Sequence, residues 1–213
     1  MVNVIDTRNS VLNTFLSEIR AVDIQQDRMR FRRNLERVGE VMAYEISKTF
    51  DYSARTIRTP INPISVMLPR QEVVIATVLR AGLPFHQGFL NYFDHAGSAF
   101  VSARRAYSRV EGQIEIRFDS VYTPDLTGKQ LLLVDPMLAT GGSSSAAIQM
   151  LKDKGVKNIR LMCIIAAPEG VKKMQEDHPD VDVYIGALDD HLNEHGYIVP
   201  GLGDAGDRIF GTK

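Results

Sequence analysis

The chain has 213 residues, of which 44% are hydrophobic and 24% charged, and its formal net charge is −1 at pH 7. These values are typical of a single globular domain. A net charge near zero excludes a strongly basic protein that would attract nucleic acid through its overall charge. With one cysteine, Cys163, no disulfide can form within the chain, which favours a cytoplasmic location, and no stretch has the roughly 18 apolar residues of a membrane span.

Two amphipathic helices are predicted within residues 1–50. Apolar side chains recur at helical spacing from Val11 to Ile19 and again from Phe31 to Ile46. Five arginines crowd the second stretch, namely Arg28, Arg30, Arg32, Arg33 and Arg37. We favour a solvated face held by ion pairs, and a basic contact for phosphate or for a partner is the alternative.

Residues 66–187 are predicted to form an α/β core, because short apolar runs alternate with helical segments. Strands are expected at 72–79, 99–103, 131–134, 159–167 and 181–187, and helices at 83–93, at 143–154 and from Pro168 onward. Gly155 stands where a left-handed cap would end the second of these helices. This alternation predicts an open, mostly parallel sheet flanked by helices.

Two polar segments fall outside that alternation. Residues 104–124 carry alternating Ile114, Ile116 and Phe118, which predicts a protruding loop or hairpin. Residues 188–213 are rich in glycine and are expected to form loops. We see no interdomain linker, so residues 1–213 are predicted to form one domain. Cys163 lies in an apolar run and is interpreted as a small buried residue.

The sequence LLLVDPMLATGGSSS at 131–145 has the pattern of a phosphate-binding loop. A buried strand is expected to end at Asp135, and a turn then leads through Thr140, Gly141, Gly142 and Ser143 into a helix. Glycines let the backbone approach a phosphate closely, and the N–H groups and positive end of the helix favour an anion. No Gly-Lys-Ser/Thr is present, so this is not a Walker loop. Two glycines before a helix are common, so the motif alone leaves a phosphate site and a structural turn equally open.

The sequence NEHGYIVPGLGDAGDRIFGT at 193–212 contains a formal dinucleotide fingerprint, Gly201-x-Gly203-x-x-Gly206. We reject that interpretation, because the fingerprint needs a following helix and an acid about 20 residues later. His191 and His195 have the spacing of helical zinc ligands, but the glycine and proline that follow argue against a helix. We therefore expect no metal site formed by protein side chains.

Both motifs resemble those of the uracil phosphoribosyltransferases, a family of type I phosphoribosyltransferases. VDPMLATGGS is similar to the loop that binds 5-phosphoribosyl-1-pyrophosphate (PRPP), and the 193–212 segment is similar to the uracil-binding loop. The resemblance implies transfer of the phosphoribosyl group of PRPP to uracil, giving UMP and pyrophosphate in pyrimidine salvage. It also implies Mg²⁺ bound through PRPP.

For PRPP, the resemblance implies that Asp135 holds the ribose hydroxyls. The 5-phosphate would be cradled by Ala139, Thr140, Gly141, Gly142 and Ser143, and Pro136, Met137 and Leu138 before them are expected to belong to the same PRPP-binding loop. The turn of Arg80, Ala81 and Gly82 and a further arginine would receive pyrophosphate, and we prefer Arg105 over Arg104 for the latter. Many relatives carry two adjacent acids at this loop, whereas this chain has Asp135 followed by Pro136.

For uracil, the resemblance implies that backbone groups of Ile198, Gly203 and Ala205 read the base edge, with Tyr197 packed on the base. Asp204 would act on the PRPP side of the new bond, so the expected catalytic residues are Asp204, Arg105 and Asp135. The alternative for Asp204 is that it caps a turn, as aspartate often does.

Two other functions stay open at this stage. A phosphoribosyltransferase for another base is one, although the C-terminal motif argues against it. A PRPP-sensing regulator is the other, and the arginine cluster of residues 28–37 is its sole support. The family commonly forms homodimers or higher oligomers, and some members respond to GTP as an allosteric effector. The sequence settles neither property for this chain.

Overall fold

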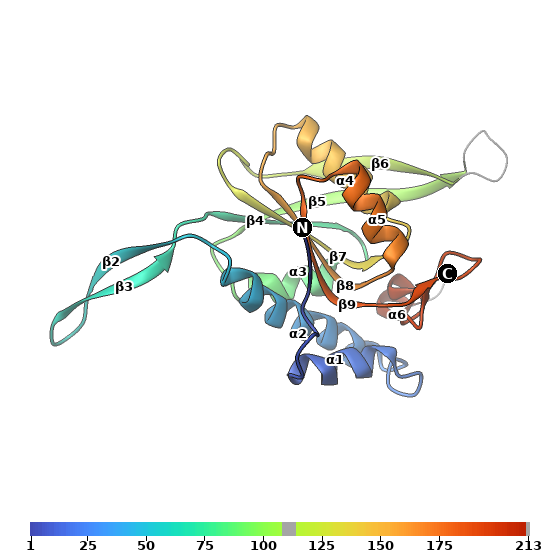
Figure 1. Cartoon of the computed structure of the whole chain (residues 1–213), viewed down its shortest axis with the longest axis horizontal. Helices are drawn as coiled ribbons and strands as arrows, with labels where there is room; N and C mark the ends of the chain where they lie inside the picture. The colour runs from blue at the N-terminus through green and yellow to red at the C-terminus, as the bar shows by residue number, and fades with distance from the viewer. Residues whose placement is uncertain (108–113, 212–213) are drawn as a thin grey trace.

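The structure, a computed structural model, describes residues 1–107 and 114–211, and it describes side chains outside 103–119. A seven-stranded sheet forms its centre, with the strand order β1-β9-β8-β7-β4-β5-β6 (Figure 1). The strands are β1 (Val2–Val4), β4 (Val73–Leu79), β5 (Gly97–Tyr107), β6 (Ile114–Tyr122), β7 (Gln130–Leu138), β8 (Ile159–Ala166) and β9 (Asp182–Leu188). Neighbouring strands are parallel except for the antiparallel pair β5–β6. The predicted open, mostly parallel sheet is confirmed.

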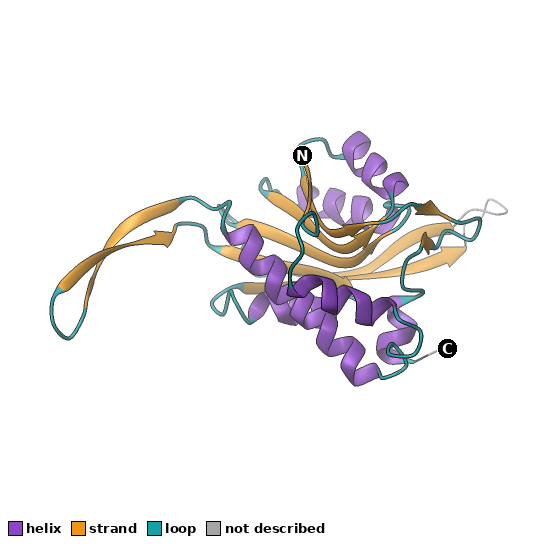
Figure 2. Ribbon diagram, turned by 60° about the horizontal axis from the view of Figure 1, so that its bottom comes forward, coloured by secondary structure: helices purple, strands orange, loops and turns teal. Residues whose placement is uncertain are grey.

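Helices cover both faces of the sheet (Figure 2). On one face lie α1 (Val11–Arg20), α2 (Arg28–Ser47) and α3 (Leu83–Leu90), and on the other lie α4 (Gly142–Asp153) and α5 (Pro168–Asp177). Alternate residues of one strand enter the two cores: Leu132 packs with the first group and Leu133 with the second. This double burial explains why the central strands read as continuous apolar runs.

Local signals in the sequence set several helix ends. Ser10 caps α1 in a capping box with Asn13, and Asp27 caps α2 by accepting a hydrogen bond from the Arg30 N–H. Gly155 follows α4 with φ +88°, as its expected role at the end of the helix requires. Cys163 is buried in β8, as predicted, and burial raises the pKa of its thiol.

The segment 52–69 departs from the prediction, which placed the start of the core at residue 66. These residues form a separate antiparallel hairpin, β2 (Tyr52–Arg58) and β3 (Pro63–Pro69), and the core begins with β4. The hairpin projects from the body in both views (Figures 1 and 2). Nearly all of its residues are exposed on both faces, so it lacks the buried apolar stripe by which strands are recognised.

Other strand and helix boundaries also differ. β7 continues to Leu138 instead of ending at Asp135, because it stays paired with β8 beyond Pro136, through Met137↔Ile165 and Leu138↔Ala166. β5 extends to Tyr107 and pairs with β6, so the protruding segment is a hairpin, and its residues 108–113 lie outside the described residues. The tail contains the short strands β10 (His191–Leu192) and β11 (Ile198–Val199) and a helix, α6 (Ala205–Phe210), where only loops were expected.

Two of the five arginines in the α2 cluster form ion pairs, in line with the favoured interpretation. Arg30 pairs with Glu18, and Arg33 pairs with Glu36. Arg32 differs, because its Nη1 donates to the Ile209 carbonyl at 2.9 Å and so ties α2 to the C-terminal helix. Within the described residues, no helix is long and apolar enough to cross a membrane.

Candidate active site

The loops after β4 and β7 lie side by side at one edge of the sheet. The two strands are parallel neighbours, with Thr77 opposite Val134, and the buried Thr77 hydroxyl donates to the Val134 carbonyl at 3.0 Å. Their carboxyl ends therefore deliver the Arg80 turn and the 139–141 loop to a common edge. This is the edge at which open α/β sheets bind ligands.

Asp135 is the acidic group at this edge. Its side chain accepts weak hydrogen bonds from the Met137 N–H and the Ser144 hydroxyl, both at 3.3 Å. Burial raises the pKa of the Asp135 carboxyl to about 6, and these two hydrogen bonds oppose that shift only in part. Asp135 is therefore a carboxylate with few internal partners, available to accept hydrogen bonds from a hydroxylated ligand.

The glycine loop forms a tight backbone turn into α4. Gly141 is the N-cap of α4 at φ +79°, and the Gly142 N–H lies 3.5 Å from the Thr140 hydroxyl. Gly170 of α5 packs directly beneath, where an added Cβ would lie 2.3 Å from the Ala139 carbonyl oxygen. The first amides of α4 have no partner within the helix, so they are available to an anion.

The Arg80 turn packs equally closely on its own strand. A Cβ at Gly82 would lie 1.8 Å from the Thr77 hydroxyl oxygen, so only glycine fits there. The Arg80 guanidinium lies 5.2 Å from the centre of the Phe210 ring, within cation–π range. Phe210 was missed in the sequence analysis, although it belongs to the C-terminal motif, because an exposed phenylalanine carries no pattern of its own.

The C-terminal segment reaches the phosphate loop. A Cβ at Gly196 would lie 4.0 Å from the Thr140 methyl group, so the β10–β11 turn borders the loop. Ile198 and Ala205 are buried, Gly203 has φ +83°, and Tyr197 is 46% exposed. The structure thus brings together the two motifs and the Arg80 turn, which are far apart in the sequence.

Asp204 has a structural role at the start of the last helix. It is the N-cap of α6, and its Oδ1 accepts a hydrogen bond from the Asp207 N–H at 3.0 Å. Capping is the alternative that the sequence offered for this residue. The residue is exposed, and Oδ2 has no partner among the described residues. The cap therefore occupies one carboxylate oxygen, and the catalytic role stays a prediction.

The second pyrophosphate arginine is not placed by the structure. Arg104 and Arg105 are in β5, opposite Arg117 and Ile116 of β6, and their side chains lie outside the described residues. The preference for Arg105 stays a prediction.

The candidate site is not built as a metal cage. Among the described residues, no group of three or more His, Cys, Asp or Glu side chains is arranged to hold a metal ion. His191 lies in β10 and His195 in the following turn, so the two do not share a helix face. Asp135 alone does not fit a resident metal site.

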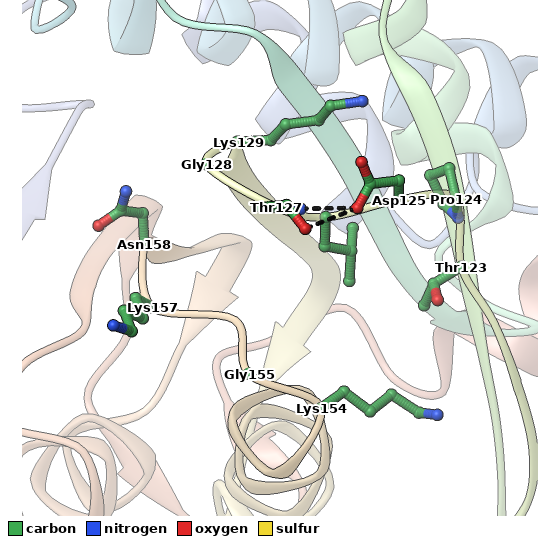
Figure 3. A pocket seen from close by; sticks show the side chains of 11 residues that line it. Thr123, Pro124, Asp125, Thr127, Gly128, Lys129, Lys154, Gly155, Lys157 and Asn158 are labelled. Carbon is green, nitrogen blue, oxygen red and sulfur yellow. Dashed lines mark hydrogen bonds between the residues drawn. The ribbon is translucent and has the colours of Figure 1, made fainter.

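A separate hollow of about 650 Å³ lies at the opposite edge of the sheet (Figure 3). It is lined by residues 123–129, which precede β7, and by residues 154, 155, 157 and 158, which precede β8. Lys129, Lys154 and Lys157 contribute to its wall. Since it faces the amino ends of these strands, it is distinct from the candidate active site.

An acid at a central strand, a glycine loop leading into a helix and a neighbouring arginine turn meet at the edge where open α/β sheets bind ligands, which is the arrangement expected of a type I phosphoribosyltransferase. A hypoxanthine phosphoribosyltransferase from Staphylococcus aureus, at 14% identity and a TM-score of 0.50, shares the fold over 86% of this chain and 83% of its own. The AQ2163 protein from Aquifex aeolicus is more similar, with 30% identity and a TM-score of 0.88 over 100% of this chain and 99% of its own.

The model of the family described as "Uracil phosphoribosyltransferase" matches residues 6–212. A uracil phosphoribosyltransferase from Porphyromonas gingivalis is 51% identical over 96% of this chain and 95% of its own length. One from Agathobacter rectalis is 49% identical over 86% of this chain and 87% of its own. The chain belongs to the uracil phosphoribosyltransferase family and is a transferase.

Proposed function

We propose that the enzyme joins uracil to the ribose C1 of PRPP at the edge of the sheet beyond β4 and β7, giving UMP and pyrophosphate. The observation that carries the proposal is the meeting of the two motifs: Gly196 borders Thr140, and Phe210 lies under Arg80. A ligand in the phosphate loop would therefore have the C-terminal segment beside it, as a two-substrate transfer requires.

The phosphoribosyl group is held by the phosphate loop. The amides and hydroxyls of 139–143 bind the 5-phosphate, and Asp135 accepts hydrogen bonds from the ribose 2- and 3-hydroxyls. The weak internal hydrogen bonds of Asp135, at 3.3 Å, support this role, because they leave its acceptor capacity for a ligand. Pyrophosphate leaves toward Arg80, whose planar fork matches phosphate oxygens, with Arg105 as the second arginine.

Uracil is selected by backbone groups. The base offers a carbonyl at position 4 and an N–H at position 3, which a backbone N–H and C=O can pair with. Ala205 begins α6, so its N–H has no partner within the helix, and Ile198 and Gly203 border the same loop. Cytosine reverses the donor and acceptor on its edge and would leave a buried group unpaired. Tyr197 packs on the base.

The reaction needs positioning and charge stabilisation rather than a side-chain nucleophile. Displacement at the ribose C1 develops oxocarbenium character, by analogy with glycosyl transfer. The enzyme holds uracil N1 close to C1, so that the N1–C1 bond forms as the C1–O bond to pyrophosphate breaks and the N1 proton is released to water. Asp204 acts on the PRPP side through a ribose hydroxyl or a bound water, and Arg80 and Arg105 stabilise the departing pyrophosphate. When bound to PRPP, Mg²⁺ would supply additional charge neutralisation at the pyrophosphate, beside Arg80 and Arg105.

A panel of bases tests this function. With PRPP and Mg²⁺ present, we expect uracil to be converted far faster than cytosine or hypoxanthine. Equal turnover of uracil and hypoxanthine would favour a phosphoribosyltransferase for another base. PRPP binding without turnover of any base would favour the PRPP-sensing regulator.

We propose that the enzyme works as a homodimer or a higher homo-oligomer in the cytoplasm. The β2–β3 hairpin supports an oligomer, because it exposes Ile57, Ile61, Ile64 and Met67 by 43%, 87%, 51% and 59%. Isolated two-stranded hairpins are marginally stable in water, and exposed apolar patches mark contact sites. The single buried cysteine supports a reducing compartment.

A further inference from the structure

Three residues far apart in the sequence close a ring of hydrogen bonds beside the C-terminal segment. Arg20 ends α1, Asp189 follows β9, and Gly201 lies between β11 and α6. Arg20 Nη2 donates to Asp189 Oδ1 at 2.6 Å, and Arg20 Nη1 donates to Asp189 Oδ2 at 2.8 Å and to the Gly201 carbonyl at 3.0 Å. The Gly201 N–H donates to Asp189 Oδ2 at 2.9 Å. One ion pair thus holds both backbone polar groups of a single glycine.

Burial makes this pair costly as a means of stabilisation alone. The Asp189 side chain is 5% exposed and that of Arg20 is 23% exposed. Removing two charges from water is unfavourable, and well-packed apolar residues can often replace a buried pair without loss of stability. An apolar pair, however, could not bind the N–H and C=O of Gly201. The ion pair is therefore better suited to holding the backbone of Gly201 in place than to stabilising the core.

Gly201 transmits its position to the predicted base-binding residues. Its φ is +62°, and a Cβ there would lie 2.1 Å from the Ile198 carbonyl oxygen. The chain therefore folds back directly over Ile198, which is 4% exposed, while the neighbouring Leu202 is 3% exposed. Because Gly201 packs against Ile198 and lies two residues before Gly203, its position helps to set the positions of both.

We propose that Arg20 and Asp189 are positioning residues for base recognition: they hold Gly201 so that Ile198, Gly203 and Ala205 present their backbone groups to uracil. They act through Gly201 rather than on the substrate. The inference rests on the proposed function, because it takes this segment as the uracil site. Misplacement of a reacting group by about 1 Å can cost about a hundredfold in rate, so the placement matters for catalysis.

The variants Arg20→Lys and Asp189→Asn test the proposal. Lysine keeps the charge but cannot form the planar fork that bonds both Asp189 oxygens and the Gly201 carbonyl. Asparagine keeps the size of Asp189 and loses its charge. For each variant we expect the KM for uracil to rise about tenfold, as for a weakened buried hydrogen bond, while the KM for PRPP changes less than twofold. Turnover of cytosine relative to uracil should increase.

Glu18→Gln is the matched control. Glu18 also lies on α1 and also binds an arginine through both carboxylate oxygens, but its partners are Arg30 and Asn34 of α2. We expect it to leave both KM values unchanged. Each KM is independent of the fraction of folded enzyme, so a loss of stability does not imitate the predicted split.

The outcomes separate the two proposals. A wild-type enzyme without uracil turnover would refute the proposed function. An active wild type together with an unchanged uracil KM in Arg20→Lys and Asp189→Asn would refute the positioning role alone. The same holds if both KM values rise equally, or if both variants are unfolded, since the pair would then be a stabilising element.

Discussion

Replacing Asp204 separates its cap from its proposed catalytic role. The cap uses Oδ1, which accepts from the Asp207 N–H at 3.0 Å, and asparagine offers an equivalent oxygen. Asp204→Asn should therefore preserve α6 and change the free energy of unfolding by less than about 0.5 kcal/mol. Asp204→Ala removes the cap and should cost about 1 kcal/mol, which lowers Tm by roughly 2–4 °C in a chain of this size.

The proposed catalytic role depends on the negative charge of Asp204, which asparagine lacks. A lost charge-assisted contact in the transition state costs about 1.5–3 kcal/mol, so kcat and kcat/KM should fall together by one to two decades in Asp204→Asn. Initial rates of UMP formation and thermal melting, measured on both variants, give the two effects independently. If Asp204→Asn has the kinetics of the wild type, Asp204 only caps α6. The same conclusion holds if the rates fall only in Asp204→Ala, in parallel with its stability.

Three further predictions concern other parts of the molecule. The pKa of Asp135 is about 6 against an ordinary 3.8, so kcat/KM for PRPP should rise as the pH passes 6 and the carboxylate forms. Asp135→Asn should lose this pH-dependent rise and most of the activity while remaining folded. Between pH 3.8 and 6 the folded state binds a proton at Asp135 that the unfolded state has lost. The contribution of Asp135 to the free energy of unfolding is therefore present below pH 3.8 and is lost as the pH rises through 6. Urea unfolding of wild type and Asp135→Asn as a function of pH measures this contribution, and the same pH dependence in both would contradict it. A methyl group at Gly170 would lie 2.3 Å from the Ala139 carbonyl oxygen, so Gly170→Ala should raise the KM for PRPP about tenfold. Gly128→Ala strains a backbone at φ +71° and can cost stability, but it lies at the opposite edge of the sheet and should not alter the KM for PRPP. Replacing Ile61 and Ile64 by serine should lower the mass measured by light scattering to that of a smaller assembly, and an unchanged mass would remove the hairpin from the oligomer contact.

The sequence predicted the parts of the fold that carry local signals. Buried runs such as 131–134 identified the parallel strands, and Ser10, Asp27 and Gly155 marked helix ends. The hairpin of 52–69 escaped prediction because neither of its faces is buried. The predicted strand ends at Asp135, whereas pairing with β8 carries β7 past Pro136 to Leu138. In both cases tertiary pairing, rather than local propensity, decides the structure.

The same distinction between local sequence signals and tertiary contacts applies to the candidate site. The glycine loop, Asp135 and the Arg80 turn could be identified because strand-to-helix junctions are visible in sequence. The contacts of Arg20 with Asp189 and Gly201, and of Arg80 with Phe210, join residues more than 100 positions apart. No rule of sequence spacing connects such residues, so their contacts can be identified only from the fold.

A crystal structure of the enzyme with UMP tests the central claim most directly, because one product occupies the sites of both substrates. We predict that its phosphate contacts the amides of 139–143, its ribose hydroxyls contact Asp135, and its base edge pairs with the backbone of Ile198, Gly203 and Ala205. UMP bound elsewhere, or with its base directed away from the C-terminal segment, would contradict the account.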